Sequence, residues 1–492
     1  MLLLGIDLGT SSIKVSLVDG ATRQTLATTQ FPDSERSIIS LQTGWAEQDP
    51  ELWWEDVKAA VRRLHQTGKF KSADIGAIGI SYQMHGLVLV GKDGKALRNS
   101  IIWCDSRAIP YGDEALQAMG ADYCLQHLLN APGNFTAAKL AWVKVNEPDI
   151  FGKIYKILLP GDYIAQRLTG TMTTTPSALS EGIFWDFTAG KISERVMDYF
   201  GFPDDIIPDI QPVCSDHGRL TKAVAEELSL TEGIPVCYKA GDQLNNALSL
   251  NVMEPGEVAA TAGTSGVIYG ISDQLTFDPQ SRINSFAHVN HGNDLTRVGV
   301  LLCINGTGIL NKWIRQLTGA QDYETMNDLA QKVAPGSEGL AVFPFGNGAE
   351  RMLNNKMPGA GLQAIDLNQH SAAHVIRASQ EGIAFAFRYG LDIMRANGMA
   401  PAVIRAGRAN MFLSPVFAEA FVNATNIPIE LCDNNGSVGA ALGAGIGYGY
   451  FKTPADAFLE EDRLEVLEPT RAADYEHWYQ SWKEKLERQL MY

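Results

Sequence analysis

The sequence predicts an α/β protein whose two halves begin with the same strand–turn–strand pattern. Three observations support this prediction. The chain has 492 residues, which is too long for one hydrophobic core, so two or three domains are expected. Its N-terminal part reads as three strands, a helix and another strand, an order typical of an α/β fold with a mixed sheet. The strand–turn–strand pattern then recurs in the second half of the chain.

The first strand–turn–strand unit spans residues 1–18. An apolar run reaches Asp7, the tripeptide Gly9-Thr10-Ser11 forms a turn, and the alternating residues 13–18 read as a half-buried strand. Such a turn offers backbone amides and hydroxyls to a polyphosphate, while the carboxylate faces its metal ion. When the unit is taken alone, an ordinary N-terminal hairpin is the simpler explanation.

The next segments continue the α/β order. Residues 25–31 predict a third strand, and a helix is expected to begin at Pro50 with Asp49 as its N-cap. Residues 75–81 and 86–90 are rich in apolar side chains and predict two further strands.

The middle of the chain contains the expected domain boundary. Residues 108–235 read mainly as helices and loops, which suggests a cap or insertion on the first domain. A new strand is predicted at residues 234–240, and the boundary is expected just after it. We therefore expect an N-terminal domain over residues 1–248 and a C-terminal domain over residues 249–492.

A second strand–turn–strand unit follows this boundary. Residues 256–261 and 266–271 predict two strands, and the turn between them contains Gly263-Thr264-Ser265. The tripeptide Gly-Thr-Ser thus occurs at matching places in both units, as expected for a duplicated domain with a cleft between the halves and one phosphate loop from each. No GxxxxGK[ST] sequence occurs, so a P-loop nucleotide-binding protein is not expected.

Composition and charge exclude several classes of protein. A formal net charge of -16 argues against nucleic acid as a partner, because phosphate-backbone binding needs clustered Lys and Arg. The six cysteines are scattered without a CxxC pair, which fits a reduced, cytoplasmic chain. The N-terminal apolar run lacks a basic segment before it and meets an acidic residue at once, so no secretory signal is predicted. The most apolar later window, residues 76–90, is interrupted by Ser81, Gln83 and His85, so no membrane span is predicted.

Several motifs, in their order along the chain, resemble one known family. Besides the two Gly-Thr-Ser turns, they are Phe135–Val143 with the following Glu147-Pro148, Gly241-Asp242-Gln243, and the layout of Gly361–Glu381. Together they resemble the FGGY family of carbohydrate kinases, which are relatives of hexokinase, actin and the heat-shock ATPases. The resemblance extends from Leu4 to about Tyr450.

This resemblance implies two ribonuclease H-like domains of the actin/hexokinase ATPase type, with ATP and a sugar in an interdomain cleft. Transfer of a phosphoryl group from ATP to a hydroxyl needs a carboxylate that accepts the hydroxyl proton. Asp242 ends a predicted strand and is the expected catalytic base. Asp7 is the expected residue for Mg²⁺, acting through water, because Mg²⁺ gives up its hydration reluctantly.

The resemblance also implies that both halves hold ATP. The expected nucleotide-binding residues are Gly9, Thr10, Ser11, Gly263, Thr264, Gly308, Lys312 and Gly407. The adenine-side segment Ile404–Asn410 departs from the family pattern, since it keeps Gly407 as its one clear glycine. The glycine-rich stretch 439–449 is expected to form a closely packed helix near the adenine pocket, and not a dinucleotide-binding fingerprint.

Within the family, Ser81–Gly86 resembles the Gln-Met-His-Gly segment of xylulokinases. The expected sugar contacts are therefore Met84, His85, Asp105 and Asp242, and the expected substrate is D-xylulose. Trp103 would either stack on a sugar face or belong to the core. Gln243 is a departure, because xylulokinases usually carry Asn directly after the catalytic aspartate.

Two other functions remain open at this point. One is a kinase for another ketose or polyol, such as ribulose. The other is a non-kinase ATP-driven switch with the same actin-like core. Members of the family are often homodimers, but no segment of the sequence requires a dimer. The expected partners are thus ATP and a small sugar, with no nucleic acid and no membrane.

Overall fold

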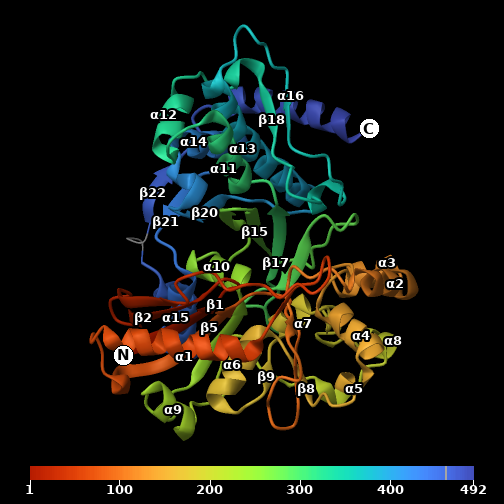
Figure 1. Cartoon of the computed structure of the whole chain (residues 1–492), viewed down its shortest axis with the longest axis vertical. Helices are drawn as coiled ribbons and strands as arrows, with labels where there is room; N and C mark the ends of the chain where they lie inside the picture. Colours follow the sequence, from red (N-terminus) through yellow and green to blue (C-terminus); the bar gives the residue numbers. More distant parts are fainter. Residues whose placement is uncertain (460–462, 492) are drawn as a thin grey trace.

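The computed structural model describes residues 1–459 and 463–491, which form two halves stacked along the long axis of the molecule (Figure 1). Each half contains one large sheet. The N-terminal sheet has the strand order β13-β5-β1-β2-β3, and the C-terminal sheet has the order β16-β17-β15-β14-β20-β21-β22. Helices and strands mix along both halves, which confirms the predicted α/β class.

The strands of the N-terminal sheet lie close to their predicted positions. They are β1 (Leu2–Leu8), β2 (Ile13–Asp19), β3 (Thr25–Phe31), β5 (Ile75–Tyr82) and β13 (Val236–Gly241). Strand β1 pairs antiparallel with β2 and parallel with β5, and β5 pairs parallel with β13. The carboxyl ends of β1, β5 and β13 therefore meet at one edge of the sheet.

Helix α1 (Pro50–Gln66) begins where the sequence predicts it. The Asp49 side chain accepts the Glu51 amide at 2.9 Å, which satisfies one of the free donors of the first turn. Its buried side chains, which include Trp53 and Val57, pack against β2 and β3. This helix covers one face of the N-terminal sheet.

Helix α15 (Gly436–Gly447) covers the other face of the same sheet (Figure 1). Because strand residues alternate between faces, Leu3, Gly5 and Asp7 share the side that meets α15. A Cβ on Gly5 would lie 1.8 Å from the Ser437 carbonyl oxygen, so the contact requires glycine. The sequence predicts a closely packed small-residue helix here, and the structure packs it on the N-terminal sheet.

Residues 108–235 form helices and loops as predicted, with several short strands added. The helices are α2 (Ile109–Met119), α3 (Ala121–His127), α4 (Thr136–Asn146), α5 (Pro148–Phe151), α6 (Pro160–Thr169), α7 (Pro176–Glu181), α8 (Glu194–Phe200) and α9 (Lys222–Leu228). The short strands of this half are β4 (Glu47–Gln48), β6 (Val88–Val90), β7 (Ser100–Ile101), β8 (Lys156–Leu158), β9 (Thr173–Thr174), β10 (Trp185–Asp186), β11 (Lys191–Ile192) and β12 (Asp209–Ile210).

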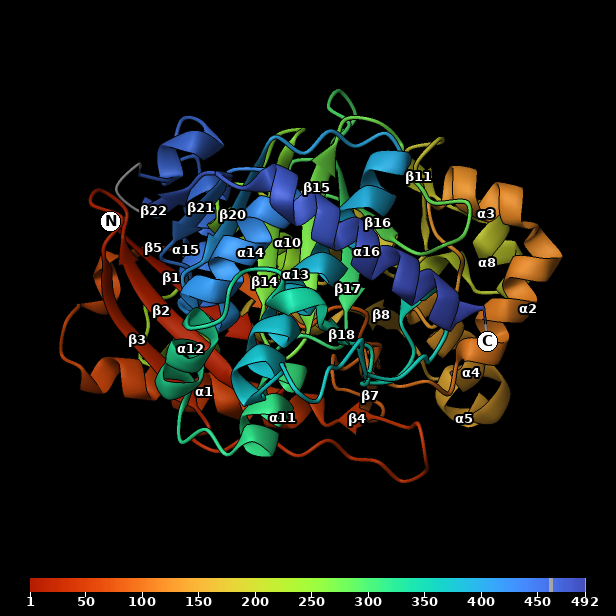
Figure 2. The same ribbon diagram turned by 90° about the horizontal axis from the view of Figure 1, so that it is seen from above.

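The C-terminal sheet starts with the second predicted strand–turn–strand unit, β14 (Glu257–Ala262) and β15 (Gly266–Ser272). Its other strands are β16 (Asn284–Ala287), β17 (Val298–Ile304), β20 (Val403–Gly407), β21 (Ile429–Cys432) and β22 (Arg463–Leu467). The long helix α13 (Ala372–Ala396) packs against β15 and β17, and α14 (Pro415–Thr425) and α16 (Ala472–Leu490) lie over it (Figure 2). A small sheet of β18 (Ala341–Phe343) and β19 (Gly361–Gln363) adjoins α13.

The two halves are connected through α10 (Asp242–Ser249), which follows β13 and contacts α15. The predicted domain division falls at the end of this helix. Since α15 comes from the C-terminal part of the chain but packs on the N-terminal sheet, the chain passes between the halves more than once. In the part of the chain that the structure describes, no helix is both long enough and apolar enough to cross a membrane.

Gly79 tests how closely α15 must approach the sheet. A Cβ on Gly79 would lie 1.9 Å from the Ala440 carbonyl oxygen, so Gly79→Ala must displace the helix backbone. We expect a loss of about 3 kcal/mol in the free energy of unfolding, measured by urea denaturation. Gly292→Ala is the matched control, because no atom lies within 4 Å of its Cβ position. Equal losses in the two variants would contradict the close-contact argument.

His217 gives the fold a specific pH dependence. The imidazole is fully buried, with Nδ1 3.2 Å from Thr173 Oγ1 and Nε2 3.1 Å from the Val213 carbonyl oxygen. Burial lowers the pKa of His217 to about 3, and the nearby Lys239 charge adds to this effect. The folded protein therefore keeps His217 neutral at pH values where the unfolded chain is protonated, below about pH 6.5.

We expect His217 to destabilise the fold by about 1.4 kcal/mol per pH unit as the pH falls below about 6.5. His217→Gln keeps a hydrogen-bond donor but cannot take up the proton. Its free energy of unfolding should therefore fall less between about pH 7 and about pH 5 than that of the wild type. Urea unfolding at the two pH values measures the difference, and parallel losses would show that His217 does not titrate on unfolding.

Candidate active site

The segments that leave β1, β5 and β13 meet at the carboxyl edge of the N-terminal sheet. In the strand register, Leu8 of β1 and Gly241 of β13 both lie opposite Tyr82 of β5. The Gly9-Thr10-Ser11 turn, the segment Gln83–Gly86 and Asp242 therefore start next to one another. Ligands of open α/β sheets bind beyond the carboxyl ends of the strands, so this edge is the expected position of an active site.

Asp242 is the first residue of α10 and directly follows Gly241. Burial raises the pKa of its carboxyl to about 7, and the negative charge of Asp7 contributes to the rise. A Cβ on Gly241 would lie 2.6 Å from Met84 Cγ and 3.1 Å from Glu181 Oε2. The structure thus places Met84 against the residue that directly precedes Asp242.

Asp7 lies beside the N-terminus of α15. A Cβ on Gly436, the first residue of that helix, would lie 2.6 Å from Asp7 Oδ2. Burial raises the pKa of the Asp7 carboxyl, and the Lys14 ammonium on the neighbouring strand opposes the rise. In residues 1–459 and 463–491 Asp7 forms no salt bridge, so its carboxylate is available to a cation.

Asp7 fits a magnesium ion that takes most of its ligands from elsewhere. Among the described residues, no three His, Cys, Asp or Glu side chains lie close enough together to hold a metal ion. Mg²⁺ commonly keeps several waters and binds one or two carboxylates together with substrate phosphates. A single available carboxylate beside a phosphate-binding turn matches that pattern.

His85 is held in a strained backbone conformation at the same edge. Its φ is 62°, a left-handed value that a side chain other than glycine rarely adopts. Its carbonyl oxygen accepts Lys139 Nζ at 2.7 Å, and its Nδ1 lies 3.1 Å from the carbonyl oxygen of Glu181. Because a carbonyl can only accept, Nδ1 donates to it. Burial, followed by the Lys139 charge, lowers the pKa of His85 to about 3, so Nε2 remains a free acceptor at neutral pH.

Glu181 is a buried acid of this site that sequence reasoning missed. The Tyr82 hydroxyl donates to Glu181 Oε1 at 2.8 Å, while Oε2 has no hydrogen-bond partner in the described chain. Burial raises the pKa of Glu181 well above its usual range, and the Asp242 charge adds to the rise although the Tyr82 bond opposes it. No motif marks Glu181 in the sequence, because its helix α7 is separated along the chain from β5 and β13, although it contacts both in the fold.

The Gly9-Thr10-Ser11 turn is hydrogen-bonded to the segment Gln83–Gly86 through Thr10. Its hydroxyl donates to Gln83 Oε1 at 3.2 Å and accepts Trp103 Nε1 at 2.9 Å. The Gly9 amide donates within the turn, to the Ser12 carbonyl oxygen. Among the described residues, the amides of Thr10 and Ser11 have no hydrogen-bond partner, which leaves them as the donors of this turn for an anion.

A cavity of about 480 Å³ in the C-terminal half collects four of the predicted nucleotide residues: Gly263, Thr264, Gly308 and Lys312. The Gly263–Thr264 turn packs on the N-terminus of α11 (Gly308–Thr318), where the Gly308 amide donates to the Gly263 carbonyl oxygen at 2.9 Å. Tyr323 and Asn327, both in α12 (Tyr323–Gln331), form another wall. A helix N-terminus on one side and mixed polar and apolar walls on the other suit a nucleotide.

Gly407, Gly9, Thr10 and Ser11 do not line this cavity. Gly407 ends β20, and a Cβ there would lie 3.4 Å from Asn434, on the side of the loop before α15. Asn410 and Met411, which follow Gly407, line the cavity instead. The residues that follow Gly407, and not Gly407 itself, therefore border this cavity.

The predicted sugar contact of Asp105 is corrected by the structure. Its carboxylate is fully buried and binds the Ala46 amide at 2.6 Å and the Arg107 guanidinium at 2.7 Å. Arg107 in turn lies 3.8 Å above the centre of the Trp45 ring. Asp105 therefore stabilises this cluster and has no free acceptor for a sugar. Trp103 is 52% exposed, which excludes the alternative that it is a core residue.

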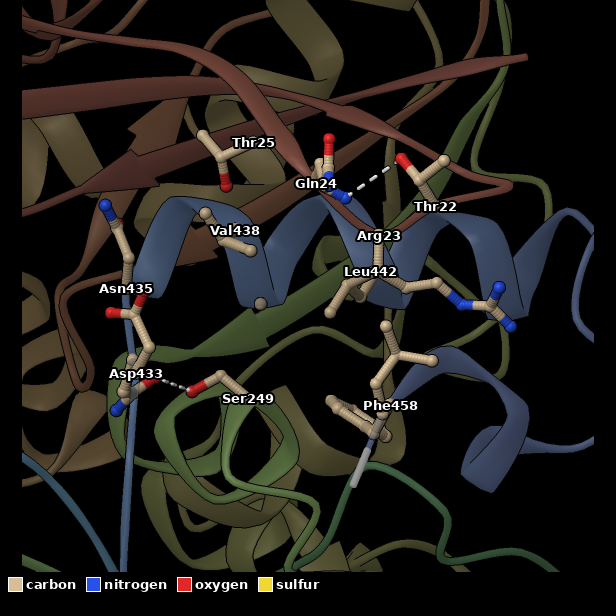
Figure 3. A pocket seen from close by; sticks show the side chains of 13 residues that line it. Thr22, Arg23, Gln24, Thr25, Ser249, Asp433, Asn435, Val438, Leu442 and Phe458 are labelled. Carbon is tan, nitrogen blue, oxygen red and sulfur yellow. Dashed lines mark hydrogen bonds between the residues drawn. The ribbon is translucent and has the colours of Figure 1, made fainter. Parts of the chain in front are cut away.

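A polar cavity of about 600 Å³ lies where the turn between β2 and β3 meets α10 and α15 (Figure 3). The Ser249 hydroxyl donates to Asn434 Oδ1 at 2.5 Å, and Asn434 Nδ2 donates to Asn246 Oδ1 at 2.8 Å. These bonds connect α10 to the loop before α15. The cavity belongs to the junction between the halves and contains none of the predicted catalytic or nucleotide residues.

Family comparisons cover most of the chain. The model of the FGGY family of carbohydrate kinases, N-terminal domain, matches residues 2–249, and the model of the C-terminal domain of this family matches residues 258–448. The first match ends at the last residue of α10, and the second begins at the second residue of β14.

Individual relatives match over nearly their full length. The chain is 29% identical over 474 residues to the xylulose kinase of Bacillus subtilis, which covers 93% of this chain and 91% of that protein. The crystal structure of xylulose kinase from Rhodospirillum rubrum covers 100% of both chains with a TM-score of 0.88 and 25% identity. The crystal structure of Plasmodium falciparum glycerol kinase with ADP has a TM-score of 0.89 at 21% identity, covering 99% of this chain and 98% of that one, which is a similarity of fold.

Proposed function

Because the chain belongs to the FGGY family of carbohydrate kinases, we propose that it transfers the γ-phosphoryl group of ATP to the 5-hydroxyl of D-xylulose. The products would be ADP and D-xylulose 5-phosphate. The choice of sugar is supported by curated relatives named xylulose kinase and by the Gln83–Gly86 segment. The observation that carries the proposal is the meeting of Asp242, Met84 and the His85 segment at one edge of the N-terminal sheet.

Asp242 is the proposed general base. It would accept the proton of the sugar hydroxyl as that oxygen bonds to phosphorus, when the hydroxyl becomes acidic. A carboxylate with a pKa of about 7 is a stronger base than an exposed aspartate, which suits this task. Bound Mg²⁺, held near Asp7, would neutralise charge on the phosphate oxygens.

The two halves divide the remaining work in this proposal. The cavity lined by Gly263, Gly308 and Lys312 would hold ATP, and the amides of Thr10 and Ser11 would bind its phosphates from the other half. His85 Nε2 would accept a hydroxyl hydrogen of the sugar. Closure of the halves would exclude water, which otherwise competes with the sugar for the phosphoryl group.

A cytoplasmic location and a homodimer are also part of the proposal. No disulfide joins any of the six cysteines, all of which lie in described residues, and this is consistent with a reducing compartment. Size-exclusion chromatography with light scattering would give the oligomeric state directly.

An acceptor panel tests the proposed substrate. Coupled ADP release would be measured with D-xylulose, ribulose, pentitols, glycerol and hexoses. We expect the highest kcat/KM with D-xylulose and little ATP turnover without sugar. A preference for ribulose or for a polyol would reassign the acceptor, and sugar-independent turnover would favour an actin-like ATPase switch.

Asp242→Asn tests the base. The amide keeps the size of the side chain but cannot accept the proton, so we expect kcat to fall by about 10²–10⁴-fold. The dissociation constants for ATP and sugar, measured by calorimetry, should change by less than about threefold, because the lost interaction acts in the transition state. Near-wild-type turnover in this variant would remove Asp242 from the mechanism.

His85→Ala tests the sugar contact. Loss of a neutral hydrogen-bond acceptor should raise the KM for sugar by about tenfold while the KM for ATP stays within about twofold. Steady-state kinetics with each substrate varied in turn separates the two. His217→Gln is the matched control, since it changes another buried histidine, whose amide bonds to Val236 at the start of β13 and not to the carboxyl edge. An unchanged sugar KM would make His85 a purely structural residue.

A further inference from the structure

Lys139 is a buried ammonium group with a single hydrogen bond. It lies in α4, within the segment Phe135–Val143 that contributes to the family resemblance, and its side chain is fully buried. Its Nζ donates to the His85 carbonyl oxygen at 2.7 Å. Within residues 1–459 and 463–491 no carboxylate oxygen lies within 4 Å of this nitrogen. An ammonium group has three donors, so Lys139 leaves two of them unused.

Lys239 shows how a buried lysine is accommodated elsewhere in the same half. It is 1% exposed and binds the Asp162 carboxylate at 2.6 Å, the Thr173 carbonyl oxygen at 2.7 Å and the Thr173 hydroxyl at 3.1 Å. Its charge is balanced and all its donors are used. A buried charge without a counter-ion is costly. Packing alone therefore does not account for an ammonium group at position 139, and its one bond must be considered.

The acceptor of that bond belongs to a strained residue. The φ of His85 is 62°, and a side chain other than glycine keeps such a value only where the surrounding structure holds it. The Thr136 hydroxyl donates to the same carbonyl oxygen at 3.4 Å. Because residues three apart lie on one face of a helix, Thr136 and Lys139 reach this oxygen together. Helix α4 thus holds the His85 backbone from one side.

The imidazole ring of His85 is held by the same group of elements. Its Nδ1 donates to the Glu181 carbonyl oxygen of α7 at 3.1 Å, and the Phe135 ring meets it edge-on at 4.9 Å between centres. The Ala137 amide donates to the Gly182 carbonyl oxygen at 3.0 Å, which connects the first turn of α4 to the end of α7. Backbone and ring of His85 are therefore fixed by two helices that are bonded to each other.

This arrangement leaves one polar atom of His85 open. In the run from Ser81 to Val90, His85 is the one residue that is not buried, and its side chain is 17% exposed. Its Nε2 has no partner in the described chain and, unlike Nε2 of His288, is not shielded from solvent. The held residue therefore presents a free acceptor at the edge of the sheet where the sugar is proposed to bind.

We propose that Lys139 is a positioning residue for the sugar site. Its ammonium group holds the His85 carbonyl oxygen, keeps the backbone left-handed and so directs Nε2 toward a sugar hydroxyl. The inference rests on the proposed sugar phosphorylation and deepens it, because it names the group behind the sugar contact. It also gives the spacing of Thr136 and Lys139 a physical reason: two donors one helical turn apart meet one carbonyl oxygen.

Lys139→Met tests the bond by kinetics, since methionine fills a similar volume but cannot donate. We expect the KM for the sugar to rise by about tenfold, while kcat and the KM for ATP stay within about twofold. Thr136→Val removes the longer bond and should raise the sugar KM by less than about threefold. Lys144→Met is the matched control and should keep the wild-type values, because this lysine of the same helix donates to the Phe200 and Gly201 carbonyl oxygens.

The double variant His85→Ala with Lys139→Met shows whether Lys139 acts through His85. Without the imidazole there is no ring to direct, so Lys139→Met should raise the sugar KM by less than about twofold over His85→Ala alone. A further rise of about tenfold would mean that Lys139 affects the sugar independently of His85, and would overturn the proposal.

The nitrogen signals of isotope-labelled histidines give a readout that needs no substrate. In the wild type His85 should show one neutral form protonated on Nδ1, identified by its loss in His85→Ala. Lys139→Met should shift or split this signal and leave those of His217 and His288 in place, and Lys144→Met should change none of them. An unchanged His85 signal in Lys139→Met would overturn the proposal.

Stability separates positioning from a purely structural role. Because Lys139→Met removes a buried charge without a counter-ion, its thermal midpoint should be no lower than that of the wild type. A lower midpoint together with shifts in all the histidine signals would make Lys139 structural and overturn the proposal. The acceptor panel on the wild type tests the proposed function separately. If another sugar is the substrate, it replaces D-xylulose in these measurements, and if none is, the histidine signals still decide whether Lys139 positions His85.

Discussion

The close contact between α15 and the N-terminal sheet is the constraint on which the geometry of the site depends. Gly5 and Gly79 let the helix backbone approach the strands, and this brings Gly436 against the Asp7 carboxylate. The same helix contacts α10, whose first residue is Asp242. One packing interaction therefore sets the positions of both acids. Because α15 comes from the C-terminal part of the chain, it also ties these acids to the half that contains the nucleotide cavity.

The site holds three acids, Asp7, Asp242 and Glu181, whose pKa values are all raised by burial. Asp242 interacts with each of the other two. Lys139 is a buried cation on the sugar side, and burial lowers its pKa to about 7. This local excess of acid favours the binding of a divalent cation, which would stabilise the ionised carboxylates. Metal-bound ATP brings such a cation. The electrostatics of the site therefore agree with membership of a kinase family that uses ATP.

Sequence patterns identify the parts of this site that are local. The turn after β1, its copy after β14 and Asp242 at the end of β13 each stand next to a strand, and the match to the FGGY family confirms that resemblance. Contacts between distant segments could not be predicted. The occupied hydroxyl of Thr10, the pairing of Asp105 with Arg107 and the position of α15 all follow from how elements pack. Glu181 lies in a segment without a recognised motif.

The fold alone does not choose the acceptor, because a glycerol kinase structure matches this chain as well as a xylulose kinase structure does. The sheet edge and the nucleotide cavity supply what every phosphoryl transfer to an alcohol needs. Selection of the acceptor must then come from side chains that differ between kinases of the same fold. In the proposed site the end of β5 carries His85, whose ring lies 5.4 Å from the ring of Phe286 in the C-terminal half. A sugar bound beside His85 would therefore lie where the halves meet and would favour the closed arrangement, and water would not. Recognition of the acceptor and protection of ATP from hydrolysis would then be one physical event.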